Sequence, residues 1–99
     1  MTTIENLDKA FESRVRLGIM SVLTGAGQSD FNTLKTMLGV SDGNLASHIK
    51  ALEELGYIET MKQFIGRKPN TSYSVTDAGK KAFSAHIDAL TSLLEIKND

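Results

Sequence analysis

The sequence predicts a small α+β domain that is mostly helical and contains a helix-turn-helix. Three observations support this prediction. Apolar residues recur every three or four positions through much of the chain, which is the spacing of a helical face. Two short helical segments meet near Gly39, as in a helix-turn-helix. After Gly56 the pattern changes to two alternating stretches around a turn, which predicts a β-hairpin.

The composition indicates a globular, cytoplasmic protein. Its 99 residues suffice for one domain, expected to span 1–99, and 40% of them are hydrophobic and 23% charged. No apolar run is long enough to cross a membrane, and the start lacks the pattern of a signal peptide. The absence of cysteine excludes disulfides, thiol nucleophiles and thiolate metal sites. With a formal net charge of −1, any argument for nucleic-acid binding depends on where the charges lie.

Residues 5–24 are predicted to form the first helix. Phe11 and Val15 belong to an apolar stripe with three- and four-residue spacing, and glycines follow the end of this segment. Leu17 and Met20 fall on a second side of the same helix. Because the helix has two apolar sides, we expect it to pack against two different surfaces.

Two shorter helices follow and form the predicted helix-turn-helix. Asp30 is a suitable N-cap for the first of them, and Gly39 suits the left-handed position after its end. Ser41 is the N-cap candidate of the second, "SDGNLASHIKALEELG", which is predicted to end at Gly56. Only Val40 separates Gly39 from Ser41, so the two helices are joined by a tight turn.

A two-stranded hairpin and a long helix complete the chain. The segments "YIETMKQFI" and "TSYSV" are rich in β-branched and aromatic residues, and "GRKPN" between them is a turn sequence. Pro69 cannot donate to a β-ladder, so it is expected at the hairpin tip. Thr76 is expected to cap the last helix, which spans about 76–97, and Asp77 suits its first turn.

The last helix carries more apolar surface than one small core can cover. An apolar stripe and a neighbouring row of alanines occupy a wider part of its circumference than a single contact needs. We therefore expect a homodimer held by this helix and the second side of the first, because small alanines let helices approach closely. The residues predicted to form the interface are Leu17, Met20, Ala82, Ala85, Ala89, Leu93 and Ile96.

Two stretches carry a resemblance to a known family. "VSDGNLASHIKALEELGYI" resembles the recognition helix and its exit in winged helix-turn-helix transcriptional regulators of the MarR and ArsR type. "SYSVTDAGKKAF" resembles the end of the wing and the start of the last helix in the same regulators. The resemblance covers nearly the whole chain. It implies a three-helix core with a two-stranded wing and a regulator that binds specific sites in double-stranded DNA. The homodimer expected from the apolar surface of the last helix would suit a palindromic site.

Some properties of these regulators are not implied here. Metal sensors of the ArsR type often carry a cysteine pair near the recognition helix, and this chain has no cysteine. Larger MarR proteins have extra terminal helices that shape a ligand pocket, and 99 residues leave little room for such helices. The resemblance therefore does not imply that this protein binds a small-molecule effector. His48 and His86 lie on different predicted helices without further ligands at metal-binding spacing. We expect no metal or other cofactor, and no residue combination indicates an enzyme.

In the regulators that this sequence resembles, the exposed side of the recognition helix contacts bases in the major groove. Asparagine and serine side chains can bind base edges, small residues allow close approach, and lysine suits a phosphate. The alternative is that this polar side is only solvated. The residues predicted to contact DNA from this helix are Ser41, Asp42, Gly43, Asn44, Ser47, His48 and Lys50.

The predicted hairpin carries three cations, Lys62, Arg67 and Lys68, and no acid between Thr60 and Thr76. As a wing it would lie on the DNA backbone or in the minor groove, where phosphates favour lysine and arginine. We therefore predict DNA contacts by all three.

Two other classes of function remain open. A winged-helix module that binds another protein has no need of a basic tip, and an RNA-binding protein would need stacking aromatics that are missing here.

Overall fold

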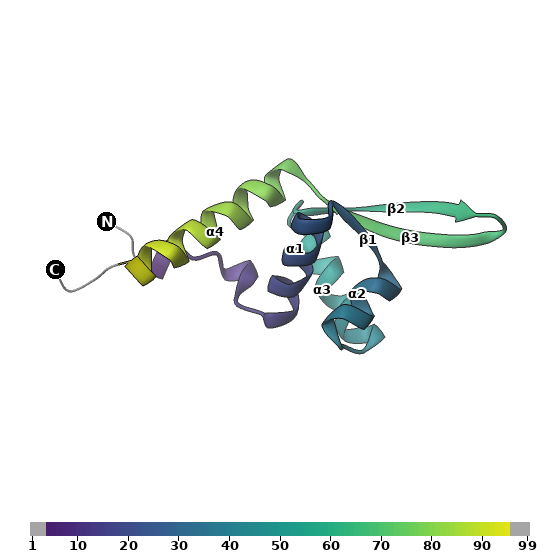
Figure 1. Ribbon diagram of the computed structural model, residues 1–99, viewed down its shortest axis with the longest axis horizontal. Coiled ribbons are helices and arrows are strands. Elements are labelled where there is room, and N and C mark those ends of the chain that lie inside the picture. The colour runs from purple at the N-terminus through teal and green to yellow at the C-terminus, as the bar shows by residue number, and fades with distance from the viewer. Residues whose placement is uncertain (1–3, 96–99) are drawn as a thin grey trace.

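The computed structural model describes residues 4–95, which form helices and one small sheet (Figure 1). The elements in chain order are the 3-10 turns η1 (Ile4–Asn6) and η2 (Lys9–Phe11), helix α1 (Arg14–Ala26), strand β1 (Gln28–Asp30), helices α2 (Phe31–Leu38) and α3 (Asp42–Glu54), strands β2 (Ile58–Ile65) and β3 (Lys68–Val75), and helix α4 (Asp77–Glu95). The predicted α+β class, the helix-turn-helix, the hairpin and the long last helix are all confirmed.

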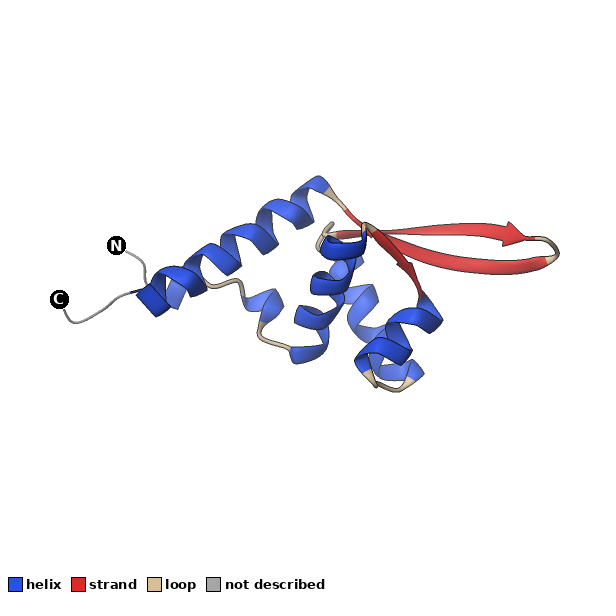
Figure 2. Cartoon of the chain, viewed as in Figure 1, coloured by secondary structure: helices blue, strands red, loops and turns tan. Residues whose placement is uncertain are grey.

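The molecule is elongated, with extents of 61 × 25 × 21 Å. Helices α1, α2 and α3 form a central body, the β2–β3 hairpin projects from one end of it, and α4 runs out from the opposite end (Figures 1 and 2). Two elements therefore extend beyond the core, and each presents surface that the core does not cover.

The first helix is shorter than predicted. It begins at Arg14, and part of the preceding segment forms 3-10 turns. The reason is local competition for backbone donors: the Asp8 carboxylate accepts from the Ala10 N–H at 2.9 Å, and the Ser13 hydroxyl oxygen accepts from the Arg16 N–H at 3.3 Å. Phe11 is nevertheless buried, as its place in the apolar stripe suggested.

Helix α1 lies at the centre of the core and contacts α2, α3, α4 and both β1 and β3. Both of its apolar sides are consequently covered within the chain. Met20 is completely buried, so its predicted place in a dimer interface is wrong. The completely buried large side chains of the core are Ile19, Met20, Leu23, Leu34, Leu45 and Leu52.

The sheet has three strands in the order β1-β3-β2, where the sequence predicted two. Strand β1 pairs antiparallel with β3, with Gln28 opposite Ser74 and Asp30 opposite Ser72. It was missed because it is only three residues long and polar, and its partner strand lies far along the chain. This pairing ties the start of the helix-turn-helix to the base of the hairpin.

The hairpin turn consists of Gly66 and Arg67, between the paired residues Ile65 and Lys68. Gly66 has a φ of 66°, as the first position of a type II′ turn requires. Pro69 lies one pair beyond the turn, opposite Phe64, rather than at the tip itself. Because hydrogen-bonded and non-hydrogen-bonded pairs alternate, this second pair does not need the N–H that proline lacks.

The predicted caps of the helix-turn-helix are confirmed. The Asp30 carboxylate accepts from the Thr33 N–H at 2.7 Å, and this bond lowers the pKa of Asp30. Gly39 adopts a left-handed conformation with a φ of 65° after α2. The Ser41 hydroxyl oxygen accepts from the Asn44 N–H at 3.2 Å and starts α3.

The start of α4 is fastened to the end of α3 by a compact junction. The Thr76 hydroxyl donates to the carbonyl oxygen of Gly56 at 2.6 Å and accepts from the Gly79 N–H at 2.9 Å. The Thr76 N–H donates to the carbonyl oxygen of Tyr57 at 3.0 Å. A Cβ atom on Gly79 would lie 2.1 Å from that same oxygen, so only glycine fits this position.

We expect Gly79→Ala to lower the free energy of unfolding by about 1–3 kcal/mol, since backbone atoms must shift to accommodate a methyl group. Gly25→Ala is the matched control, because it also lies in a helix and a Cβ there meets no atom within 4 Å. It should leave stability unchanged or raise it by up to about 1 kcal/mol. Denaturant unfolding measures both, and equal effects of the two substitutions would contradict the tight junction.

Candidate nucleic-acid interface

Helix α3 is divided into a buried and an exposed side. Leu45, Ile49 and Leu52 are buried in the core. The opposite side, called the α3 surface below, is exposed and consists of Gly43, Asn44, Ala46, Ser47 and Lys50. It combines two hydrogen-bonding side chains and one cation with two residues small enough for close approach, which is a suitable composition for a DNA groove.

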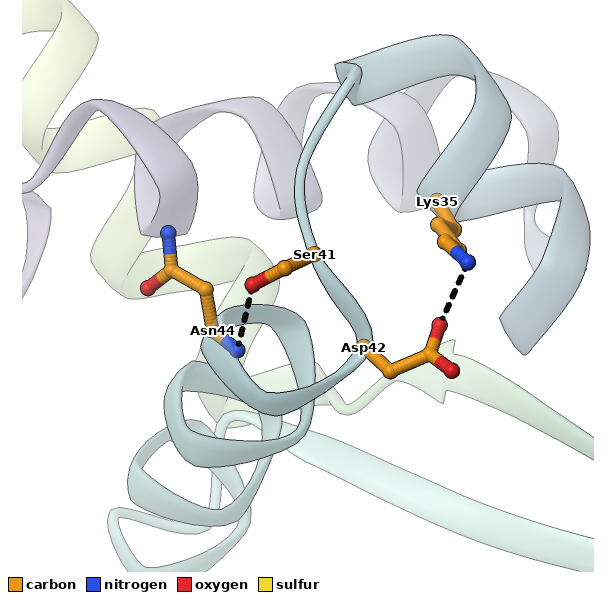
Figure 3. Close-up of polar contacts among 4 residues, drawn as sticks. All are labelled: Lys35, Ser41, Asp42 and Asn44. Atoms are coloured by element: carbon orange, nitrogen blue, oxygen red, sulfur yellow. Dashed lines mark hydrogen bonds and ion pairs between the residues drawn. The ribbon is translucent and has the colours of Figure 1, made fainter.

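At the start of α3, one predicted DNA contact is already occupied (Figure 3). The Asp42 carboxylate forms an ion pair with the Lys35 ammonium of α2 at 2.7 Å. Both side chains remain substantially exposed, so the pair contributes only about 0–1 kcal/mol to stability. Its larger effect is to offset a negative charge that would repel phosphates. The Ser41 hydroxyl caps the backbone N–H of Asn44, and the side-chain carboxamide of Asn44 takes no part in this cap.

His48, one helical turn after Asn44, was predicted among the DNA contacts, but it is half-buried. Its Nδ1 atom accepts a hydrogen bond from the Arg16 Nε–H of α1 at 3.0 Å. The ring is therefore engaged with a neighbouring helix, where it helps to position α3 against α1. His86 is engaged in the same way, because its Nδ1 accepts from the Asp8 N–H at 3.0 Å.

Arg14 is a candidate contact that the sequence analysis missed. It is exposed at the first position of α1 and lines a hollow with Val40 of the turn and Asn44 of α3. A guanidinium at this place is well suited to bind a phosphate beside the start of the recognition helix. No sequence signal marks it, because its approach to α3 depends on how the two helices cross.

The wing and α3 enclose a second hollow. It is lined by Ala46 and Glu53 of α3 and by Thr60, Lys62 and Tyr73 of the hairpin, among others. The Thr60 hydroxyl donates to the Glu53 carboxylate. Burial raises the pKa of Tyr73, and the charge of Glu53 raises it further.

The three predicted wing cations are all exposed and lie along the length of the hairpin. Lys62 is in the middle of β2 and lines the hollow beside α3. Arg67 is in the turn, and Lys68 begins β3. The structure thus brings Lys62 next to the α3 surface and places Arg67 and Lys68 at the far end of the wing.

The residues predicted to form a dimer interface do not share one exposed side. Ala89 is buried within the chain, so this prediction is wrong, and Leu17 and Ala82 are half-buried against the core. Ala85 is exposed, Leu93 is half-buried, and Ile96 lies outside the described residues. The N-terminal turn η1 packs along α4 and reaches its alanine row, which explains the difference.

A different side of α4 carries the exposed apolar residues. Ile87, Leu90 and Leu94, called the α4 stripe below, are 38%, 43% and 73% exposed. Their spacing of three and four residues aligns them on one helix face.

In residues 4–95, no helix combines the length and the apolar character that a bilayer crossing requires.

A helix-turn-helix followed by a β-hairpin that projects beside its second helix is the winged-helix architecture. The chain belongs to the winged helix DNA-binding domain family, whose pattern matches residues 15–94. It is 42% identical over 79 residues to the uncharacterized protein MJ0432 of Methanocaldococcus jannaschii, covering 80% of this chain and 86% of that protein.

Two solved structures show how closely the fold is shared. A transcriptional regulator homologue from Pyrococcus horikoshii OT3 is 30% identical, with a TM-score of 0.77 and coverage of 93% of this chain and 96% of that one. Overoxidized AbfR bound to DNA is 20% identical and shares the fold, with a TM-score of 0.76 and coverage of 93% and 67%. The expected winged-helix transcriptional regulator is thereby confirmed, and this family consists in general of DNA-binding proteins rather than enzymes.

We expect Asp42→Asn to strengthen DNA binding, because the substitution removes an anion and releases Lys35 to bind a phosphate. The slope of log affinity against log salt should steepen by up to about 0.9 per chain. Asp88→Asn is the matched control, since Asp88 is exposed on α4, away from α3. A salt titration on one duplex measures both, and an unchanged slope for Asp42→Asn would place Asp42 and Lys35 outside the DNA-facing surface.

Proposed function

We propose that this protein is a sequence-specific regulator of transcription that binds double-stranded DNA as a homodimer. The α3 surface enters the major groove, and the wing lies on the backbone or in the adjacent minor groove. One observation carries the proposal: Ala46 of the α3 surface and Lys62 of the wing border the same hollow, and the wing has three cations but no acid between Thr60 and Thr76. The DNA-bound structure of AbfR, which shares the fold, supports this use of it.

The two parts of the interface have different chemistry and hence different tasks. Lysine and arginine on the wing attract phosphates whatever the sequence, and the strength of that attraction falls with salt. Asparagine and serine on α3 carry no charge but can donate to and accept from base edges. The wing therefore supplies affinity and the α3 surface supplies discrimination.

Substitutions in the two parts should separate these tasks. Arg67→Ala should weaken binding to operator and scrambled DNA alike and flatten the salt slope by about 2 for a dimer, since each phosphate contact adds about 0.9. Asn44→Ala or Ser47→Ala should leave the salt slope unchanged. Each should reduce the difference in binding free energy between operator and scrambled DNA by about 1–3 kcal/mol per lost base contact. The measurement is a salt titration of all three variants on both duplexes.

One result would favour the other class of function. If Arg67→Ala leaves both the slope and the affinity untouched, the wing does not contact DNA, and a protein-binding module becomes the better interpretation. An arginine in a narrow minor groove also reads groove shape, so some preference for A·T-rich flanks should disappear with Arg67.

The α4 stripe supports the homodimer. Three aligned aliphatic side chains remain exposed on a helix that extends beyond its own core. A second copy related by a two-fold axis would bury the same side chains from both chains, because such an interface is self-complementary. The resulting pair of recognition helices suits a palindromic operator. This interface lies on a neighbouring side of α4 from the one expected from its alanines.

Leu90→Asp should therefore convert the dimer to a monomer, since it places a carboxylate in the middle of the α4 stripe. Ala85→Asp puts the same charge on the alanine side and should leave the dimer intact. Sedimentation of both variants at micromolar concentration distinguishes the two sides. A wild-type protein that is already monomeric there, or a dimer that survives Leu90→Asp, would contradict the assignment.

A further inference from the structure

The far end of the wing carries exposed apolar side chains among its cations. Phe64 is 74% exposed and Ile65 is 67% exposed, and both lie in the last two positions of β2. They are far from the core and from the α4 stripe, at the outer end of the hairpin (Figures 1 and 2). A large apolar group held this far from the core gains little from folding, so its use is to be sought in binding.

The two side chains point to opposite faces of the hairpin. Side chains alternate along a strand, so Phe64 shares its face with Lys62 and Thr60, which line the hollow beside α3. Its cross-strand partner is Pro69. Ile65 lies on the other face, opposite Lys68. Only Phe64 is therefore on the side of the wing that a ligand of α3 would meet.

The surroundings of Phe64 favour duplex DNA as the partner. Lys62, Arg67 and Lys68 surround it in sequence without an acid, so its partner should be a polyanion. Proteins that enter the minor groove combine such cations with a phenylalanine, leucine or proline, which they insert between base steps. An anionic membrane also attracts basic and apolar groups together, but it would not engage the α3 surface on the same side.

We propose that Phe64 is a wedge that inserts into the minor groove beside each half-site, partly unstacks one base step and bends the DNA toward the major groove. This inference rests on the proposed function and adds a mode of sequence selection to it. Pyrimidine–purine steps such as TA and CA unstack most readily. The operator should therefore carry such a step where the wing lies, although no hydrogen bond reads it.

The test uses operator duplexes with a single 2-aminopurine placed in turn at each position flanking a half-site. Unstacking raises the fluorescence of this base, whereas groove binding without insertion does not. The wild-type protein should give one enhanced position per half-site, and Phe64→Ala should abolish it. The same substitution should lower operator affinity by about tenfold or less, because the cost of unstacking cancels part of the gain from burying the phenylalanine. Ile65→Ala, which removes a similar apolar group from the opposite face, should retain the signal.

The possible outcomes are distinct. Tight operator binding without any fluorescence increase, or an increase that survives Phe64→Ala, overturns the wedge and leaves the proposed function standing. Failure to bind any duplex overturns both. Binding of the wild-type protein to vesicles rich in anionic lipid, lost in Phe64→Ala while DNA binding is unaffected, would assign the tip to a membrane instead. Because Phe64 is so exposed, its loss should leave the unfolding midpoint of the domain unchanged.

Discussion

The contact between the first turn of α4 and the carbonyl oxygen of Tyr57 fixes the geometry on which the rest of the structure depends. At this point α3 has just ended, the wing begins and ends, and α4 begins. Thr76 bonds both Gly56 and Tyr57, and Gly79 lets the helix approach without a side chain. A single junction therefore sets the wing relative to α3, and the projecting helix α4 relative to both. It also explains why the threonine and the glycine stand three residues apart in "VTDAGK".

DNA binding by this protein depends on where its charged residues lie rather than on its net charge. The chain has a formal net charge of −1, so no overall field draws it to DNA. Beyond Thr60 the hairpin carries three cations and no acid, and Lys35 pairs with the Asp42 carboxylate at the start of α3. Contacts between these cations and phosphates release counterions, so their contribution to affinity falls steeply as salt rises. This suits a protein that must leave random DNA easily and remain where base contacts are added.

The features that depend on neighbouring residues could be predicted from the sequence. The caps at Asp30 and Ser41, the left-handed Gly39 and the hairpin all follow from side chains within a few positions of one another. The features that depend on distant contacts could not. Strand β1 pairs only with β3, which lies far along the chain, and the His48 ring is engaged by Arg16 of another helix. The alanine side of α4 was assigned to a partner chain because the packing of η1 on α4 has no signature in the sequence.

The central claim is that the α3 surface and the wing of each chain hold adjacent grooves of one DNA half-site, and that two chains bind together. Selection from a random duplex pool, followed by methylation and hydroxyl-radical footprinting of the selected site, tests it most directly. The account predicts two inverted half-sites with centres about one helical turn, or a multiple of it, apart, each with guanine protection in the major groove and adjacent minor-groove protection. Recovery of no common sequence, or major-groove protection without any neighbouring minor-groove footprint, would contradict it.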